Sequence, residues 1–164
     1  MAWLIIFIAV AMVLAPITLM MPSPAQKKQA ILRERARERG LMVNIVDLPQ
    51  SHRQKVRQEA AQQGVSYTLR IARKKGQTRP LWFFWREEPL DEPAAGKIPP
   101  DAIFEELKVL REDMPADIVG LESTEAGYCV YWRERGSTDT VDYIAGLLSK
   151  VRELAGGEQL DDRT

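Results

Sequence analysis

The stretch "LWFFWREE", residues 81–88, decides the fold, because it places large apolar side chains on both sides of a short strand. Successive side chains of a strand point to opposite faces, so neither face of this strand is polar. A second stretch of the same kind, "YCVYWRER", covers residues 128–135. Aromatic and β-branched residues favour strands that are paired and covered. The two stretches therefore predict an antiparallel sheet with helices packed on it, an α+β fold.

The chain around these stretches shows further strands and helices. A capping box, Ser51 with Gln54, starts a polar helix, and apolar side chains recur at helical spacing in two later segments. The expected elements are a strand at 41–48, a helix at 51–63, strands at 65–73 and 81–88, a helix at 101–111, a strand, turn and strand over 116–135, and a helix at 139–155.

The order of these elements suggests an internal duplication. The triplet "WRE" occurs at 85–87 and again at 132–134, and the helices that precede the two copies begin 50 residues apart. We therefore expect an α-β-β unit present twice; two unrelated hairpins are the alternative. The predicted domain covers 41–157, with halves 41–88 and 101–156, a proline-rich linker at 89–100 and an acidic tail at 158–164.

The N-terminus carries an uninterrupted apolar run. Residues 2–21 contain no charge, and twenty residues of helix reach about 30 Å, the thickness of a bilayer core. Basic residues follow the run and none precedes it, which favours an uncleaved transmembrane anchor over 1–22. The expected location is a bacterial inner membrane, single-pass, with the N-terminus outside and the C-terminal domain cytoplasmic. A signal peptide cleaved after 23–25 is the alternative.

Charge is unevenly distributed along the chain. Residues 1–40 carry six Lys and Arg against two Asp and Glu, residues 41–100 ten against six, and residues 101–164 seven against fifteen. Residues 23–40 are expected to form a basic helical arm that ends at Gly40. Basic residues there and in the 70–79 turn are candidates for contact with anionic lipid or another polyanion: Lys27, Lys28, Arg33, Arg73, Lys74 and Lys75.

Motifs for catalysis or cofactor binding are not found in the sequence. It has no phosphate-binding glycine loop, no C-x-x-C and no G-x-S-x-G. The only histidine, His52, follows a helix cap, and the only cysteine, Cys129, lies within an apolar strand, where a small buried side chain is typical. The sequence predicts no catalytic residue, metal ligand or cofactor.

The juxtamembrane stretch "MMPSPAQKKQ", residues 20–29, resembles the YajC accessory subunit of the preprotein translocase, which also follows one span with Pro, Gln and paired Lys. The layout of the whole chain is similar to uncharacterised single-span inner-membrane proteins of Gram-negative bacteria. Neither resemblance implies an activity or a functional residue.

Function is expected to depend on an aromatic surface. Two amphipathic helices can cover one face of the sheet, so the second face of strand 81–86 is expected to bind a partner. The side that ends in Arg86 is the candidate, which gives Trp82, Phe84 and Arg86. The predicted function is a membrane-anchored, non-enzymatic accessory or assembly protein of an inner-membrane complex. The alternatives are nucleic-acid or anionic-lipid binding through a 70–79 hairpin and an enzyme without a recognisable motif. A sheet end buried by the linker and the arm would leave no such surface.

Overall fold

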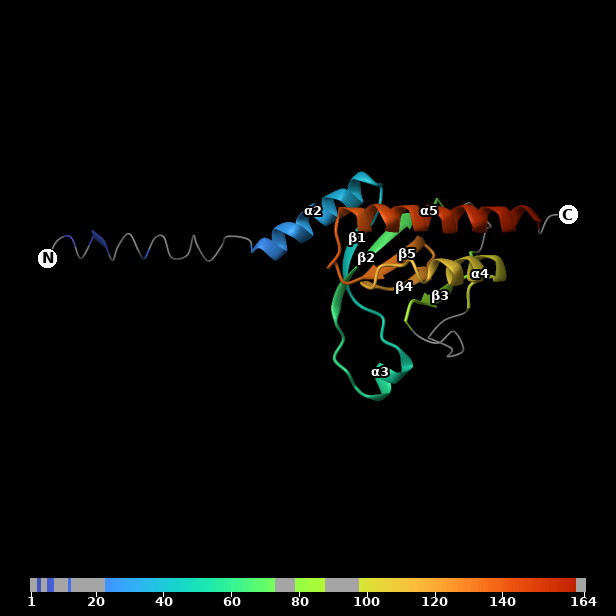
Figure 1. The fold of residues 1–164 in the computed structure, drawn as a ribbon, viewed down its shortest axis with the longest axis horizontal. Helices are drawn as coiled ribbons and strands as arrows, with labels where there is room; N and C mark the ends of the chain where they lie inside the picture. Colours follow the sequence, from blue (N-terminus) through green and yellow to red (C-terminus); the bar gives the residue numbers. More distant parts are fainter. Residues whose placement is uncertain are drawn as a thin grey trace. The chain divides into compact units, whose positions relative to one another are not determined.

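The computed structural model describes residues 23–72, 79–87 and 98–161, with side chains to residue 156, and single residues at 3, 6, 7 and 12. The chain divides into two compact units, residues 1–31 and residues 32–164. Figure 1 labels the elements, which are α2 (Pro24–Glu38), β1 (Met42–Asp47), α3 (His52–Val56), β2 (Gln63–Arg70), β3 (Trp82–Trp85), α4 (Asp101–Leu110), β4 (Ile118–Ser123), β5 (Gly127–Trp132) and α5 (Thr138–Asp161).

The described strands form one five-stranded sheet in the order β1-β2-β5-β4-β3, and all neighbours are antiparallel. The predicted α+β class with an antiparallel sheet is confirmed. The β4–β5 hairpin is also confirmed, and its turn is closed by hydrogen bonds between Thr124 and Gly127.

The predicted hairpin of strands 65–73 and 81–88 is wrong. β2 pairs with β5, and β3 pairs with β4, so the β4–β5 hairpin separates the two strands. A duplicated unit with two equivalent hairpins is therefore not formed. Both strands carry the pattern of a buried strand, and that pattern does not specify which strand lies beside which.

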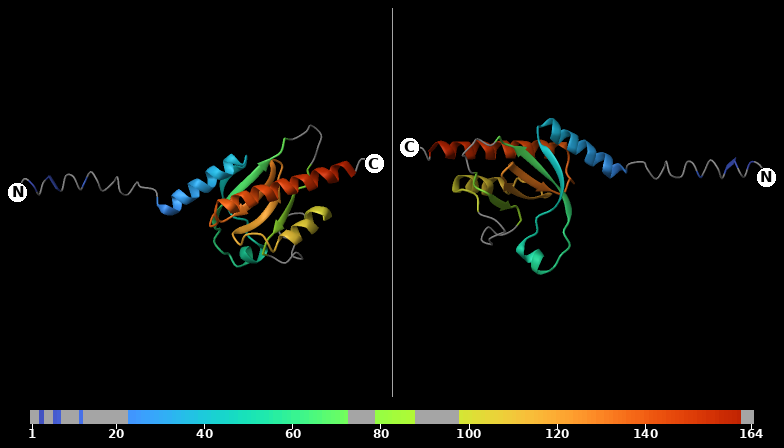
Figure 2. Two further views of the ribbon diagram at one scale, coloured as in Figure 1. Left: turned by 45° about the horizontal axis from the view of Figure 1, so that its top comes forward. Right: turned by 180° about the vertical axis from the view of Figure 1, so that it is seen from behind.

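The core lies between one face of the sheet and the helices. Figure 2, left, shows α5 lying across the strands, with α4 beside it. Apolar side chains at helical spacing, such as Val141, Ile144 and Leu148, form a stripe on α5 that is buried completely. The strands contribute alternate residues to this core, which are Val65, Tyr67, Trp82, Phe84, Ile118, Leu121, Tyr128, Val130 and Trp132.

The basic arm is helical as predicted, and the reason for its end is visible. Gly40 adopts φ +74°, its N–H donates to the carbonyl of Arg37, and the N–H of Leu41 donates to the carbonyl of Ala36. These two bonds are those of a Schellman motif, in which glycine accepts the left-handed conformation at low cost. Within the second unit, Leu32 and Ala36 of α2 belong to the core.

The predicted transmembrane helix is not found among the described residues. None of the helices that the structure describes is both long enough and apolar enough to cross a bilayer. The longest, α5, has 24 residues but carries charged residues along its length. The predicted anchor covers 1–22, of which the structure describes residues 3, 6, 7 and 12. The predicted single-pass location in an inner membrane depended on that anchor, so the structure does not support it either.

The two faces of β3 differ in their contribution to stability. We expect Phe84→Ala to lower the free energy of unfolding by about 3–5 kcal/mol, because Phe84 is 1% exposed and packs edge-on against Phe104. Phe83→Ala, the matched control on the opposite face, should cost less than half as much. Urea denaturation followed by circular dichroism measures both; equal losses would contradict the assignment of the core face.

Candidate functional site

The face of the sheet that points away from the core is the candidate site, and we call it the outer sheet face. Its described strand residues include Ser66, Thr68, Phe83, Trp85, Glu122, Cys129 and Tyr131. None of these residues belongs to the core cluster, whose strand members all come from the opposite face. The expectation that the amphipathic helices cover one face of the sheet is therefore confirmed.

Three aromatic rings lie together on the outer sheet face. The ring centroid of Phe83 is 4.5 Å from that of Trp85 and 6.0 Å from that of Tyr131, and all three side chains are partly exposed. Gly120, which pairs with Trp85, makes room for them, because a Cβ there would come within 2.7 Å of the Phe83 ring. A glycine on β4 thus lets the Phe83 ring lie against the sheet.

A carboxylate and an indole N–H accompany the rings. The hydroxyl of Tyr131 donates a hydrogen bond of 2.5 Å to Oε2 of Glu122. Burial, followed by this hydrogen bond, raises the pKa of Tyr131, so the phenol stays protonated and the carboxylate is the acceptor. Nε1 of Trp85 is buried and has no hydrogen-bond partner among the described residues. Together these residues, Phe83, Trp85, Glu122 and Tyr131, form what we call the aromatic–carboxylate cluster.

Cys129 lies on the same face and is buried, as predicted. Burial raises the pKa of its thiol to about 11 and outweighs the opposing hydrogen bonds of Thr68 and Ser66. A thiol of this pKa is protonated at neutral pH, and the thiolate is the reactive form. Cys129 is therefore a structural residue of the sheet and not a nucleophile.

The predicted partner-binding residues lie elsewhere. Trp82 and Phe84 are 3% and 1% exposed, so their side chains belong to the core and offer no surface. Arg86 lies at the start of the loop that follows β3. Its Nε donates a hydrogen bond of 3.1 Å to the carbonyl of Met114. The predicted choice of side is wrong, because Trp82 and Phe84 face the core, whereas Phe83 and Trp85 on the other side of β3 are partly exposed.

The structure describes three of the six predicted polyanion-binding residues. Lys27 and Lys28 are exposed on α2 in the first unit. Arg33 forms a bidentate ion pair with Glu134, with a shortest distance of 2.6 Å from Nη2 to Oε2. Arg73, Lys74 and Lys75 lie outside the described residues. β2 and β3, the two strands of the predicted hairpin, are not neighbours in the sheet.

Arg33 instead completes a buried polar network. The side chain of Glu134 is only 2% exposed, and Oε1 also accepts a hydrogen bond of 3.2 Å from the hydroxyl of Tyr67. Burial and the neighbouring carboxylate raise the pKa of Tyr67, which keeps its proton, and the hydrogen bond to Glu134 raises the pKa of Arg33. Glu134 has φ +53°, a left-handed conformation that is uncommon outside glycine. The network holds this residue where the chain leaves β5 for α5.

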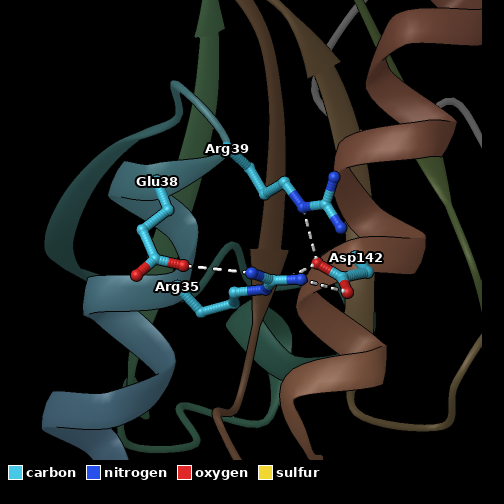
Figure 3. A network of polar contacts seen from close by, with 4 residues as sticks. All are labelled: Arg35, Glu38, Arg39 and Asp142. Carbon is cyan, nitrogen blue, oxygen red and sulfur yellow. Dashed lines mark hydrogen bonds and ion pairs between the residues drawn. The ribbon is translucent and has the colours of Figure 1, made fainter.

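Two further arginines, Arg35 and Arg39, join the end of α2 to α5. Figure 3 shows the carboxylate of Asp142 between Arg35 and Arg39, with distances of 2.9 and 2.8 Å, while Arg35 also contacts Glu38. Hydrogen bonds from Arg35 and then Arg39 lower the pKa of Asp142 to about 2. These arginines hold the helices together and are not free to bind a polyanion.

Comparisons with protein-family models, with curated proteins and with solved structures give no match for this chain. Among the described residues, no group of three or more histidine, cysteine or acidic side chains could hold a metal ion. Sequence analysis did not single out Tyr131 or Glu122. Alternation along β4 and β5 places these two residues on the same face as Phe83 and Trp85 only once the order β3-β4-β5 is known.

The ion pair between Arg33 and Glu134 is tested by removing one partner and then both. We expect Arg33→Met to destabilise the protein by about 3 kcal/mol, because it leaves the Glu134 carboxylate buried without its cation. Adding Glu134→Gln should recover at least half of that loss, since the uncompensated charge is gone. Urea denaturation measures both; a double variant that is less stable than Arg33→Met would contradict this account.

The Asp142 cluster predicts a dependence of stability on pH. The pKa of Asp142 is about 2 in the folded state and 3.8 by itself, so its ionised form stabilises the fold above about pH 4. That contribution is lost as pH falls through 2. Asp142→Asn should therefore lower the melting temperature at pH 7, and the difference from wild type should vanish near pH 2. Glu153→Gln on the same helix is the matched control; a constant difference across this range would refute the assignment.

Proposed function

We propose that this chain is a non-enzymatic binding protein that recognises an arginine side chain of a protein partner on its outer sheet face. The observation that carries the proposal is the aromatic–carboxylate cluster, in which Phe83 lies between Trp85 and Tyr131 beside the carboxylate of Glu122. Large aromatic side chains that remain partly exposed on the face away from α4 and α5 are typical of binding surfaces.

The chemistry of the cluster favours a guanidinium group. A guanidinium stacks on aromatic faces, which contributes about 0.5–2 kcal/mol, and it also donates to a carboxylate. Glu122 uses one oxygen for Tyr131, which orients the carboxylate. A cation that also stacks on a ring is a description of an arginine side chain, which a peptide or protein partner can supply.

Charge also supports a basic partner. Residues 101–164, which include β4, β5 and Glu122, carry fifteen acidic against seven basic residues. A negative field of this kind attracts basic segments and speeds their association. It also disfavours nucleic acid, which needs cations along the bound backbone, although aromatic rings on a sheet can stack on bases.

The test is selection of a random peptide library on the full chain. We expect the selected peptides to share an arginine, and we expect Phe83→Ala and Glu122→Gln each to weaken their binding roughly tenfold, the equivalent of about 1.4 kcal/mol. Val109→Ala, at a residue 72% exposed on α4, is the control and should bind as wild type.

Two outcomes would overturn the proposal. Selected peptides without a cation, or with equal affinity for the Phe83 and Glu122 variants, would show that the cluster is not the binding site. Tighter binding of a single-stranded oligonucleotide, lost in Phe83→Ala and steeply weakened by salt, would show a nucleic-acid platform instead. Circular dichroism melts of each variant establish that the fold is intact.

A further inference from the structure

The strand β1 forms one edge of the sheet, and no described strand pairs with its outward side. β1 pairs with β2 over all six residues in unbroken register, and among the described residues it pairs with no other strand. The right-hand view of Figure 2 shows β1 at the border of the sheet. An edge strand presents backbone N–H and C=O groups that can pair with another strand.

Natural proteins usually protect such an edge, and β1 has little of this protection before its last residue, Asp47. Residues 42–46, "MVNIV", contain no charge and no proline, and the ladder to β2 has no bulge. The opposite edge strand, β3, has only four residues and is followed by Arg86 and Glu87. Short length and flanking charges discourage pairing at an edge. Of the two edges, β1 is the one suited to a further strand.

The pattern of β1 is symmetric about Asn44. Two apolar residues precede it, Met42 and Val43, and two follow it, Ile45 and Val46. In an antiparallel pair of two β1 strands centred on Asn44, Val43 lies opposite Ile45 of the second copy, and Met42 lies opposite Val46. Directly opposite residues point to the same face of the sheet. Apolar side chains therefore meet apolar ones on both faces, and two asparagines meet at the centre.

The exposure of Ile45 supports the same arrangement. Its side chain lies on the core side of the sheet, opposite Val65, yet it is 62% exposed. A second copy would cover it with Val43. The alternative centre at Ile45 would place Asp47 opposite Val43 and Asn44 opposite Val46, so it matches polar with apolar residues. The sequence of the edge thus favours one register.

We propose that two copies of this chain associate through antiparallel pairing of their β1 strands, centred on Asn44, so that the two sheets become continuous. The twofold axis is perpendicular to the sheet, which keeps the outer sheet faces of both copies on the same side. The dimer would present two aromatic–carboxylate clusters on one face, toward the two opposite ends of the continuous sheet. This inference does not depend on what those clusters bind.

Disulfide trapping tests the register directly. In Asn44→Cys, the two new thiols face each other at the axis, where opposite Cα atoms lie about 4.5–5.5 Å apart, within the range of a disulfide. We expect a disulfide-linked dimer as the main product of mild oxidation of the full chain. In Ile45→Cys, the thiols are offset by two residues and should cross-link several-fold less. Val109→Cys, exposed on α4, is the control for random collision.

A charge exchange provides a second, independent readout. Asn44→Asp and Asn44→Lys should each weaken dimerisation at least tenfold by light scattering, because like charges then meet at the axis. Mixing the two variants should restore dimers, since opposite charges now meet. The proposal is overturned if Asn44→Cys cross-links no faster than Val109→Cys, or if the mixture dimerises no better than either variant alone. Faster cross-linking of Ile45→Cys would overturn the register.

Discussion

The antiparallel pairing of β2 with β5 is the contact on which the rest of the structure depends. It joins residues far apart in the chain, such as Val65 with Trp132 and Tyr67 with Val130, at the centre of the sheet. The pairing brings Tyr67 close enough to bond to Glu134 just beyond β5. Without it, the N-terminal strands and the C-terminal hairpin would be two incomplete sheets, each too small to bury the stripes of α4 and α5.

Electrostatic contacts then fasten α2 to this core. Arg33 reaches a carboxylate that is almost fully buried, whereas Arg35 and Arg39 bind Asp142 near the surface. The two groups of contacts differ physically. The buried pair is costly to break because one charge would remain without water, while the surface cluster is screened and contributes modestly. The basic arm is thus an integral part of the second unit from Leu32 onward.

The separation of the two sheet faces explains the proposed function. Strand β3 carries aromatic residues on both faces, and the helices cover only the face of Trp82 and Phe84. The other face carries the partly exposed rings of Phe83, Trp85 and Tyr131, and Gly120 on β4 lets the Phe83 ring lie against the sheet. A sheet with one fully buried face and with partly exposed aromatic rings on the other can hold its fold through the first and recognise a partner through the second.

The sequence by itself determined the local elements: the capping box at Ser51, the glycine end of α2, the stripes of α4 and α5, and the turn of the β4–β5 hairpin. Each depends on hydrogen bonds and spacings within a few residues. Only the tertiary structure decided which strands are neighbours, which side of β3 is covered, and that Arg33 binds Glu134. These depend on how much apolar surface the whole chain can bury at once, and strands 65–73 and 81–88 have the same local pattern whether they pair with each other or with β5 and β4.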